Sequence, residues 1–439
     1  MNDHFFLPRR GSIALALLLG LGGATAAQAQ TMTDPSLTVD TIVPAGAGLN
    51  QPTTMTFLGP NDFLVTEKAT GRVRRVMGNP PTLQPGFVLD VNVNSSSERG
   101  LLGSAIAPGS PARVFLYYTE AQGSDGGTAL GNRVYRYDWD PGTGTLINPL
   151  LVLDLPVTPG PNHDAGVILI EPGTGLLYAM IGDLNRNGQL QNFPSGPAPD
   201  DTGVIFRVNQ DGTAAAGNPF TPYCSVTTTQ TCASTANCPG GQTCITQVAR
   251  YFSYGVRNGF GLEFDRANGQ LWMSENGPSD FDELNKVNSG WNGGWEQIWG
   301  PGNPAVRWDV PGAGNTYSPP EFSWQQIVVP TGVNFPYAMT WGPNYNDKIL
   351  VTTQSGNIYS FPLNAARDGL DVAQLPPALQ DLVANTTTEA NLVRIGQGFG
   401  AATDLEIGPD LHLYLVDITG RIFRIRGQFP VSLQGFSVE

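Results

Sequence analysis

The sequence has few of the side chains that bind nucleic acids or usually carry acid–base chemistry. Its 439 residues include only three histidines and three lysines, and the formal net charge at pH 7 is −14. A nucleic-acid surface needs clustered cations that replace the counterions of the phosphates. The composition therefore argues against a nucleic-acid partner, whereas its acidity suits solubility and cation binding.

Long apolar runs are also missing after the first 29 residues. No later segment approaches the roughly 18 uninterrupted apolar residues of a membrane span, so we expect none. The start of the chain differs, because Arg9–Arg10 precedes an apolar run at residues 13–26 and the small-residue sequence AQA at 27–29. This pattern is typical of a secretory signal. We expect residues 1–29 to be removed and the mature protein to be secreted or periplasmic.

Several common catalytic motifs are absent. The sequence has no Gly-rich phosphate loop, no GxSxG elbow and no HExxH helix. These absences argue against a nucleotide-binding enzyme, an ordinary serine hydrolase and a zinc protease. The sequence DLNRNG, which begins at Asp183, copies the first half of a calcium loop. Pro194 stands at the twelfth position in place of glutamate, which argues against an EF-hand.

Cysteine is scarce and confined to one segment. The four residues are Cys224, Cys232, Cys238 and Cys244, within a stretch rich in Thr, Ser, Gly and Gln. In an exported chain they predict two disulfide bonds that stabilise a surface insertion at about residues 221–247, with three pairings possible. A zinc site is the alternative, although the segment has no CxxC pair and no neighbouring histidine.

The composition leaves little room for long helices. The chain has 54 glycines and 36 prolines, which separate runs of Val, Thr, Tyr and Phe in a manner typical of β-rich proteins. The one helical candidate is the short segment at residues 372–382.

A repeated unit organises the rest of the chain. Each copy has an apolar strand, a turn of Gly, Pro, Asp or Asn, and a second apolar strand. Six strand meanders predict an all-β fold, a six-bladed β-propeller over residues 30–439, with two stacked sandwiches as the alternative. The copies lie at residues 55–67, 104–120, 167–183, 261–275, 338–353 and 404–417.

A strand from the start of the mature chain is expected to close the ring. Residues 37–43, LTVDTIV, are rich in β-formers and precede the first repeat. A closed ring leaves few free sheet edges. We therefore expect this strand to complete the last blade, whose own strands end near Ile425.

Because histidine is scarce, each one can be assessed separately. His4 belongs to the signal segment and His412 alternates with leucines in a strand. His163 lies instead in the turn GPNHDAG before a first strand, where an imidazole can accept a proton if a carboxylate orients it. Asp183 ends the hairpin that follows His163, so an antiparallel return brings the two together. The alternative is a structural turn histidine.

The segment at residues 254–295 joins strand-like alternation to many polar groups at turns. The Asn268–Gly269 turn predicts a hairpin, and its second strand ends in a Gly277–Pro278 turn whose carbonyls cannot all pair within a sheet. Such an oxygen-rich turn predicts a site for a hard cation such as calcium, with a capped polar loop as the alternative. The acidic residues nearby are Glu275, Asp280, Asp282 and Glu283.

Several motifs, in this order along the chain, resemble the secreted glucose/sorbosone dehydrogenase family, the soluble quinoprotein sugar dehydrogenases and their relatives. The resemblance implies a six-bladed propeller that holds pyrroloquinoline quinone (PQQ) over the ring mouth with a calcium ion and oxidises the anomeric alcohol of a sugar. The motifs are ERGLLG at 98–103, NH at 162–163, IGD at 181–183, YGVRN at 254–258, ENGP at 275–278, DE at 282–283 and WNGGW at 291–295.

The resemblance also implies catalytic roles. His163 would be the general base that removes the hydroxyl proton as hydride leaves for the quinone, and Asp183 would orient it. Arg257 would polarise a quinone oxygen where charge develops, and Asn258 would bind alongside. Glu98 falls where the family has a polar residue near the quinone.

The metal site and one further cofactor contact follow from the same resemblance. Calcium would sit on the main-chain carbonyls of Gly277 and Pro278, beside Asp282 and Glu283, and would act on the cofactor as a Lewis acid. Trp324 falls at a position that packs against the cofactor plane.

Three positions depart from the family pattern. The glucose-oxidising members hold the PQQ carboxylates with a lysine and two arginines, and Gln354, Ala401 and Thr403 stand at these cofactor-binding positions here. One charge-assisted hydrogen bond contributes about 1.5–3 kcal/mol. The loss of three such partners is expected to weaken PQQ binding by several orders of magnitude unless another residue, such as Arg186 or Arg394, replaces them.

These observations lead to three hypotheses. The first is an oxidoreductase that acts on the CH–OH group of an aldose-type sugar or related alcohol through PQQ and calcium, with an electron acceptor that the sequence does not identify. The second is a non-catalytic propeller that binds a glycan or a protein at the ring mouth. The third is a calcium-dependent lactone hydrolase of propeller form.

Overall fold

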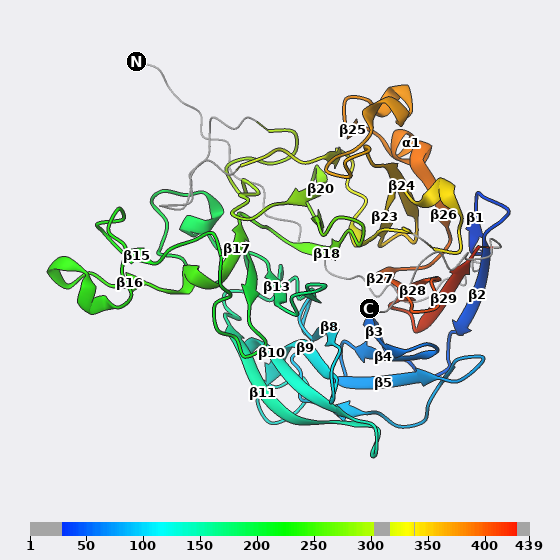
Figure 1. The fold of residues 1–439 in the computed structure, drawn as a ribbon, viewed down its shortest axis with the longest axis horizontal. Helices are drawn as coiled ribbons and strands as arrows, with labels where there is room; N and C mark the ends of the chain where they lie inside the picture. Colours follow the sequence, from blue (N-terminus) through cyan, green and yellow to red (C-terminus); the bar gives the residue numbers. More distant parts are fainter. Residues whose placement is uncertain (1–28, 303–316, 338, 428–439) are drawn as a thin grey trace, which may run out of the picture.

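In the computed structural model, six β-sheets form a ring and each sheet is one blade of a propeller (Figure 1). The structure describes residues 29–302, 317–337 and 339–427. Within this part of the chain, the strands of each blade follow one another from the centre of the ring outward. The predicted all-β, six-bladed fold is therefore confirmed. The predicted signal segment, residues 1–29, lies outside the described residues except for Ala29.

The first strand of each blade lines the centre of the ring, and each contacts the first strand of both neighbouring blades. These strands are β3 (Pro52–Gly59), β8 (Leu101–Ala107), β12 (Ile168–Ile170), β18 (Gly259–Phe264), β22 (Pro330–Asn334) and β27 (Ala402–Ile407). The second strands are β4 (Asp62–Glu67), β9 (Arg113–Ala121), β13 (Leu177–Ile181), β19 (Leu271–Glu275), β23 (Lys348–Thr353) and β28 (Leu413–Asp417).

The remaining strands complete the blades toward the outside. The third strands are β5 (Arg72–Met77), β10 (Ala129–Asp140), β14 (Val204–Val208), β20 (Asp282–Val287), β24 (Ile358–Pro362) and β29 (Arg421–Arg426). The outer strands are β6 (Thr82–Leu83) with β7 (Leu89–Asp90), β11 (Thr145–Leu155), β17 (Tyr251–Tyr254), β21 (Phe322–Trp324) with β25 (Val383–Ala384), β26 (Arg394–Gln397) with β1 (Thr31–Met32), and β2 (Thr38–Val43).

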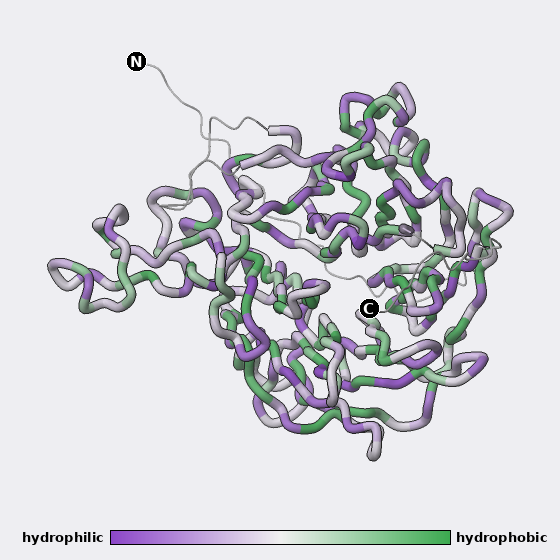
Figure 2. The backbone as a smooth tube through the Cα atoms, in the orientation of Figure 1, coloured by the Kyte–Doolittle hydropathy of each residue, from purple (hydrophilic) through white to green (hydrophobic). Residues whose placement is uncertain are grey.

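Hydrophobic side chains fill the spaces between neighbouring blades. The described residues contain six buried clusters, one at each interface between blades. Between the fourth and fifth blades, for example, Trp272 and Phe361 are fully buried. Figure 2 shows the hydrophobic stretches that run along the strands. Burial of this apolar surface, at about 25 cal/mol per Å², holds the blades together.

The ring is closed by the strand that the sequence predicted. β2 pairs antiparallel with β29, with Val39 opposite Ile425, and so becomes the outer strand of the blade that the C-terminal strands form. The carboxylate of Asp40 adds an ion pair to Arg424, at 3.0 Å, and another to Arg426. The two ends of the described chain are thereby joined in one sheet.

Two sequence predictions of local structure are wrong. The segment at residues 372–382 forms two short 3₁₀ turns, Val372–Gln374 and Pro377–Leu379, because the Pro376–Pro377 pair removes two backbone donors from any helix there. In the fifth repeat, the first strand is β22, whereas residues 339–342 of the predicted repeat form no strand and lead into another 3₁₀ turn, Pro343–Tyr345. Residue 338 lies outside the described residues.

Helices are short throughout the described residues, and none of them has the length and apolar character needed to cross a membrane. The one α-helix among them is α1 (Thr387–Ala390). The other 3₁₀ turns are Gln189–Gln191, Thr235–Asn237, Pro239–Gly241, Gln247–Arg250 and Asn391–Val393.

The cysteine-rich segment forms a separate projection from the ring (Figure 1). Its two strands, β15 (Tyr223–Cys224) and β16 (Cys244–Ile245), pair with each other. Disulfide bonds join Cys224 to Cys238 and Cys232 to Cys244, so the predicted pair of bridges is present and every cysteine is used. The zinc alternative is not compatible with this pairing, because a disulfide leaves no thiolate to bind the metal.

The closing strand supplies a test of the fold. Val43 is 1% exposed and packs between the last and first blades with Met55 and Tyr414. Val43→Asp buries an unpaired carboxylate and should lower the free energy of unfolding by about 3 kcal/mol or more. Thr41→Asp adds the same charge at an exposed position of β2. Denaturant unfolding of both variants should show a large effect for the first only, and equal effects would contradict the role of β2.

Candidate active site at the ring mouth

The predicted polar residues gather at one edge of the ring, where first strands begin and second strands end. His163 precedes β12 and Asp183 follows β13, whereas Arg257 and Asn258 precede β18. Because neighbouring strands of a blade run antiparallel, these starts and ends share one edge. We call this edge the mouth.

His163 and Asp183 form a buried pair. The imidazole Nδ1 lies 2.5 Å from Asp183 Oδ1. Asp183 also accepts hydrogen bonds from the indole Nε1 of Trp295 and from the amide of Asn185, both at 2.8 Å. These donors fix the carboxylate, and the carboxylate fixes the imidazole. With Nδ1 engaged by Asp183, Nε2 is the ring nitrogen that remains for a substrate.

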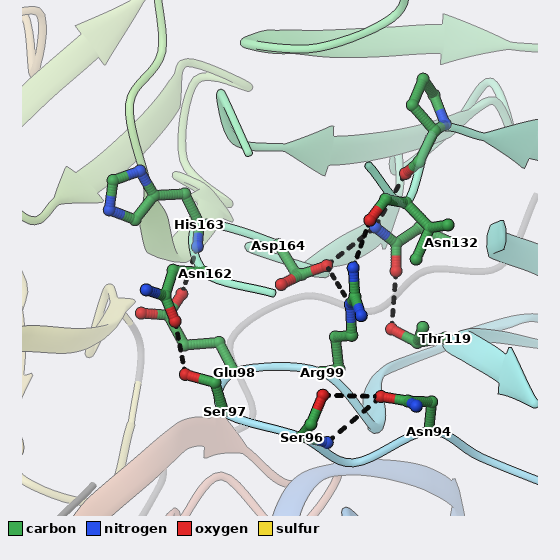
Figure 3. Close-up of polar contacts among 12 residues, drawn as sticks. Asn94, Ser96, Ser97, Glu98, Arg99, Thr119, Asn132, Asn162, His163 and Asp164 are labelled. Carbon is green, nitrogen blue, oxygen red and sulfur yellow. Dashed lines mark hydrogen bonds and ion pairs between the residues drawn. The ribbon is translucent and has the colours of Figure 1, made fainter. Parts of the chain in front are cut away.

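Glu98 connects the loops that carry His163 and Asn258. Its Oε2 accepts a hydrogen bond from the amide of His163 at 2.7 Å (Figure 3). The same oxygen accepts a hydrogen bond from Nδ2 of Asn258 at 2.9 Å. The neighbouring Ser97 donates its hydroxyl to Asn162. Asn258 Oδ1 is buried and has no partner among the described residues. The bridge therefore fixes Asn258 and leaves one of its polar atoms for a ligand.

Arg257 is anchored on one side of its guanidinium. Nη1 donates to the carbonyl of Asn276 at 2.7 Å, and the guanidinium carbon lies 5.4 Å from the centre of a Trp295 ring. Burial lowers the pKa of Arg257, while the charges of Asp183 and Glu275 act in the opposite direction. Its Nε is buried and has no partner within the described ranges. Trp295 therefore contacts both Asp183 and Arg257.

The Gly277–Pro278 turn presents two carbonyl oxygens. Neither oxygen accepts a hydrogen bond within the described part of the chain. Glycine is required at position 277 because a Cβ there would clash with the carbonyl oxygens of Asp280 and Phe281. Asp282 Oδ1 accepts the amide of Gly277 at 2.8 Å and so holds the turn in place.

The predicted metal ligands Asp282 and Glu283 are buried and accept backbone amides. Asp282 Oδ2 accepts the amides of Val328 and Val329 at 2.6 and 2.7 Å, and Glu283 Oε1 accepts the amide of Gly300 at 2.8 Å. Burial raises the pKa of both carboxyls. These contacts hold the two carboxyls beside the Gly277–Pro278 turn. Direct coordination of calcium by the two side chains stays a prediction.

The other predicted cofactor contacts are spread over three blades. Trp324 is fully buried, with its ring centre 5.1 Å from Phe322 and 5.7 Å from Phe361. This packing leaves no exposed ring face, so contact of Trp324 with a cofactor stays a prediction. Gln354 lies in the turn between β23 and β24, and Thr403 lies in β27. Both are partly exposed.

Lys68 belongs to the mouth but was not among the predicted site residues. Its Nζ donates to the carbonyls of Ser95 and Ser97, at 3.1 and 2.8 Å, and thereby holds the loop that carries Glu98. Burial lowers the pKa of Lys68 to about 8, although the nearby Glu98 charge opposes the shift. Nothing in the local sequence marks this contact, because it joins segments that are far apart along the chain.

The structure thus joins five of the predicted residues in one network of direct contacts and brings Gly277 and Asp282 together in a separate contact, whereas Trp324 lies in the core. Sequence reasoning missed Trp295 and Lys68. The Gly-rich motif at residues 291–295 was a signal for Trp295, since such a turn allows close backbone approach. The five residues of the network are His163, Asp183, Glu98, Arg257 and Asn258, and the amide of Gly277 donates to Asp282.

Known proteins are similar to this chain in sequence. A family model described as glucose/sorbosone dehydrogenase matches residues 49–229 and 233–415. Quinoprotein glucose dehydrogenase B from Acinetobacter calcoaceticus is 27% identical over 274 residues, which are 58% of this chain and 52% of that protein, so the chain spans about half its length. Aldose sugar dehydrogenase YliI from Escherichia coli (strain K12) is 24% identical over 313 residues, 69% of this chain and 75% of that protein.

Solved structures share the fold. The PQQ-bound form of an aldose sugar dehydrogenase from Streptomyces coelicolor has a TM-score of 0.61 at 24% identity and covers 89% of this chain and 98% of that one. The apo-form of the soluble aldose sugar dehydrogenase from Escherichia coli has a TM-score of 0.63 at 21% identity and covers 89% and 100%. At these identities, the likeness shows a common six-bladed architecture.

Asp164→Asn should change how stability depends on pH. Burial raises the pKa of Asp164 from 3.8 to about 6, against the hydrogen bond from Asn132 and the charge of Arg99. The folded protein therefore holds a proton that the unfolded chain releases, so this carboxyl makes the wild type lose stability as the pH rises from about 4 through about 6. The variant lacks this titration.

Urea unfolding of the wild type and Asp164→Asn between about pH 4 and pH 7 measures the effect. The difference in unfolding free energy between the two proteins should change by up to about 3 kcal/mol across this range. A difference that stays constant with pH would contradict the assignment.

Proposed function

Because the chain belongs to the glucose/sorbosone dehydrogenase family, we propose that it oxidises an aldose-type sugar or a related alcohol with PQQ and calcium. The observation that carries the proposal is the buried His163–Asp183 pair, which offers an oriented base at the ring mouth. The relative named quinoprotein glucose dehydrogenase B and the PQQ-bound aldose sugar dehydrogenase of the same fold support this choice of substrate class and cofactor.

The polar atoms left without partners fit a quinone cofactor and a hard cation. Arg257 Nε and Asn258 Oδ1 are buried at the mouth and unsatisfied among the described residues, and a buried polar atom is stable only with a partner. The carbonyls of Gly277 and Pro278 are the oxygen ligands that calcium prefers. When bound, the quinone supplies the hydride acceptor and the calcium ion supplies Lewis acidity.

His163 performs the proton transfer. Its Nδ1–H donates to Asp183, which selects the tautomer whose Nε2 carries the lone pair. This nitrogen accepts the proton of the sugar hydroxyl as a hydride leaves the carbon that bears this hydroxyl. Asp183 stabilises the imidazolium that forms. Trp295 and Asn185 keep the carboxylate in position by donating to it.

Arg257 stabilises the negative charge that would develop on a quinone oxygen of the hydride acceptor. Its guanidinium is held by the carbonyl of Asn276 and by the Trp295 ring, so little reorganisation is needed during the reaction. Preorganised donors of this kind act strongly in a site with limited access to water. Glu98 contributes by fixing the backbone of the base and the amide of Asn258.

A second candidate is a non-catalytic propeller that binds a glycan or a protein at the mouth. The observation in its favour is the neutral character of Gln354, Ala401 and Thr403, which removes three cations that other members use to hold PQQ. The two candidates differ in a measurable way, because only the first requires PQQ binding.

His163→Ala should strongly reduce turnover while cofactor binding is retained. Removal of a general base costs about 10²- to 10⁴-fold in kcat. The assay combines the mature chain with PQQ and calcium, an aldose sugar and an artificial electron acceptor, and calorimetry follows PQQ binding separately. His412→Gln is the matched control and should retain wild-type activity, since His412 lies in the last blade and contacts Thr340 of the fifth blade.

Each outcome of this assay favours one candidate. Turnover that persists in His163→Ala would contradict the assignment of the base. A folded wild type that binds no PQQ would favour the glycan- or protein-binding propeller. Lactone turnover in the absence of PQQ would instead favour the calcium-dependent hydrolase.

A further inference from the structure

One arginine occupies the sector of the mouth where the three neutral residues stand. Ala402, Asp417 and Arg421 lie opposite one another across β27, β28 and β29, at the edge of the sixth blade that faces the mouth. Directly opposed residues of antiparallel strands share one face of the sheet. Leu415 and Phe423 lie on this same face, which packs against the fifth blade.

The guanidinium of Arg421 lies close to the turn that precedes β27, and this turn packs against the turn of Gln354. A Cβ added at Gly400 would clash with Arg421 Nη2, and a Cβ added at Gly356 would clash with the backbone of Gly400. Gly356 belongs to the turn of Gln354, and Gly400 directly precedes Ala401. Gly400 therefore leaves the room that Arg421 Nη2 occupies, and Gly356 lets the two turns approach each other.

Asp417 holds Arg421 through one nitrogen and leaves the others. Arg421 Nε donates to Asp417 Oδ2 at 2.5 Å. Asp417 is fully buried and also accepts the amides of Ala401 and Thr419, at 3.0 and 3.1 Å. No hydrogen bond among the described residues uses Nη1 or Nη2 of Arg421, and its side chain is 18% exposed. A preoriented guanidinium edge with free N–H groups is suited to bidentate binding of a carboxylate.

The other cations considered for this role are already engaged or lie elsewhere. Lys68 donates to two backbone carbonyls, and Arg186 forms an ion pair with Asp200 at 2.5 Å. Arg394 lies on β26, outside the third strand of the fifth blade, opposite Tyr359. Arg421 is thus the cation in this sector whose outer N–H groups have no acceptor within the described chain.

We propose that Arg421, oriented by Asp417, binds a carboxylate of the quinone cofactor in place of the cations that Gln354, Ala401 and Thr403 lack. This inference rests on the proposed function, since it concerns the same ligand. The cation that binds the carboxylate then lies in the third strand of the sixth blade. In the glucose-oxidising members, the corresponding cations stand at the positions of Gln354, Ala401 and Thr403. The site then keeps one strong carboxylate contact, although three family positions are neutral.

Arg421→Gln tests the inference by its effect on PQQ affinity. Titration of the mature chain with PQQ in the presence of calcium, followed by calorimetry, should show about 10- to 100-fold weaker binding, or about 1.4–2.8 kcal/mol. Arg426→Gln is the matched control, because it removes the same charge from the same strand at its opposite end, where Arg426 pairs with Asp40. This control should bind PQQ as the wild type does.

Two additional measurements separate ligand binding from folding. Arg421→Lys keeps the charge but loses the bidentate geometry, so its affinity should fall between those of the wild type and Arg421→Gln. Thermal unfolding without PQQ reports whether the variants fold. Added salt should weaken PQQ binding more in the wild type than in Arg421→Gln, because the lost contact is ionic.

The outcomes distinguish this inference from the proposed function. If the wild type binds PQQ and a folded Arg421→Gln binds it equally well, the inference is overturned and the proposed function stands. If the folded wild type binds no PQQ, the proposed function fails, and the inference fails with it.

Discussion

Closure of the ring is the constraint on which the site depends. Every first strand contacts the first strands of both neighbouring blades, and the circle is completed only because β2 pairs with β29. The site residues come from loops that are distant in sequence, as the contact between Glu98 and Asn258 illustrates. Such contacts last only if the blades cannot slide, and the buried cluster at each blade interface prevents this. The closed ring of packed blades therefore holds the residues of the mouth in fixed positions relative to one another.

The second constraint is the burial of carboxyl groups behind the mouth. Glu275, Asp282 and Glu283 are almost completely buried, and burial raises the pKa of Glu275 to about 7. A buried carboxyl is costly unless hydrogen bonds satisfy it. Backbone amides supply these bonds, as Gly277 and Val329 do for Asp282. The carboxyls consequently shape the Gly277–Pro278 turn, and the carbonyl oxygens of that turn remain for a cation.

Sequence reasoning succeeded where the signal was local. The repeats predicted the blades, and the hairpin that follows His163 predicted its contact with Asp183, because an antiparallel return joins strand ends. It failed where side chains meet across blades. Trp295 donates to Asp183 over 112 positions of sequence, and no spacing rule encodes such a contact. The prediction of a helix at residues 372–382 failed for a different reason, since the Pro376–Pro377 pair lacks two amide donors that a helix would need.

The proposed function and the proposed role of Arg421 assign different tasks to two sectors of the mouth. The proposed reacting groups, His163 and Arg257, come from the third and fourth blades and are tied together through Asp183 and Trp295. The proposed anchoring groups come from the fifth and sixth blades. Contacts to a remote part of a ligand can position its reacting part, although they do not involve the reacting atoms. Under this proposal, anchoring by Arg421 changes how tightly a ligand is held, while the geometry around the imidazole is set by contacts that do not involve the fifth and sixth blades.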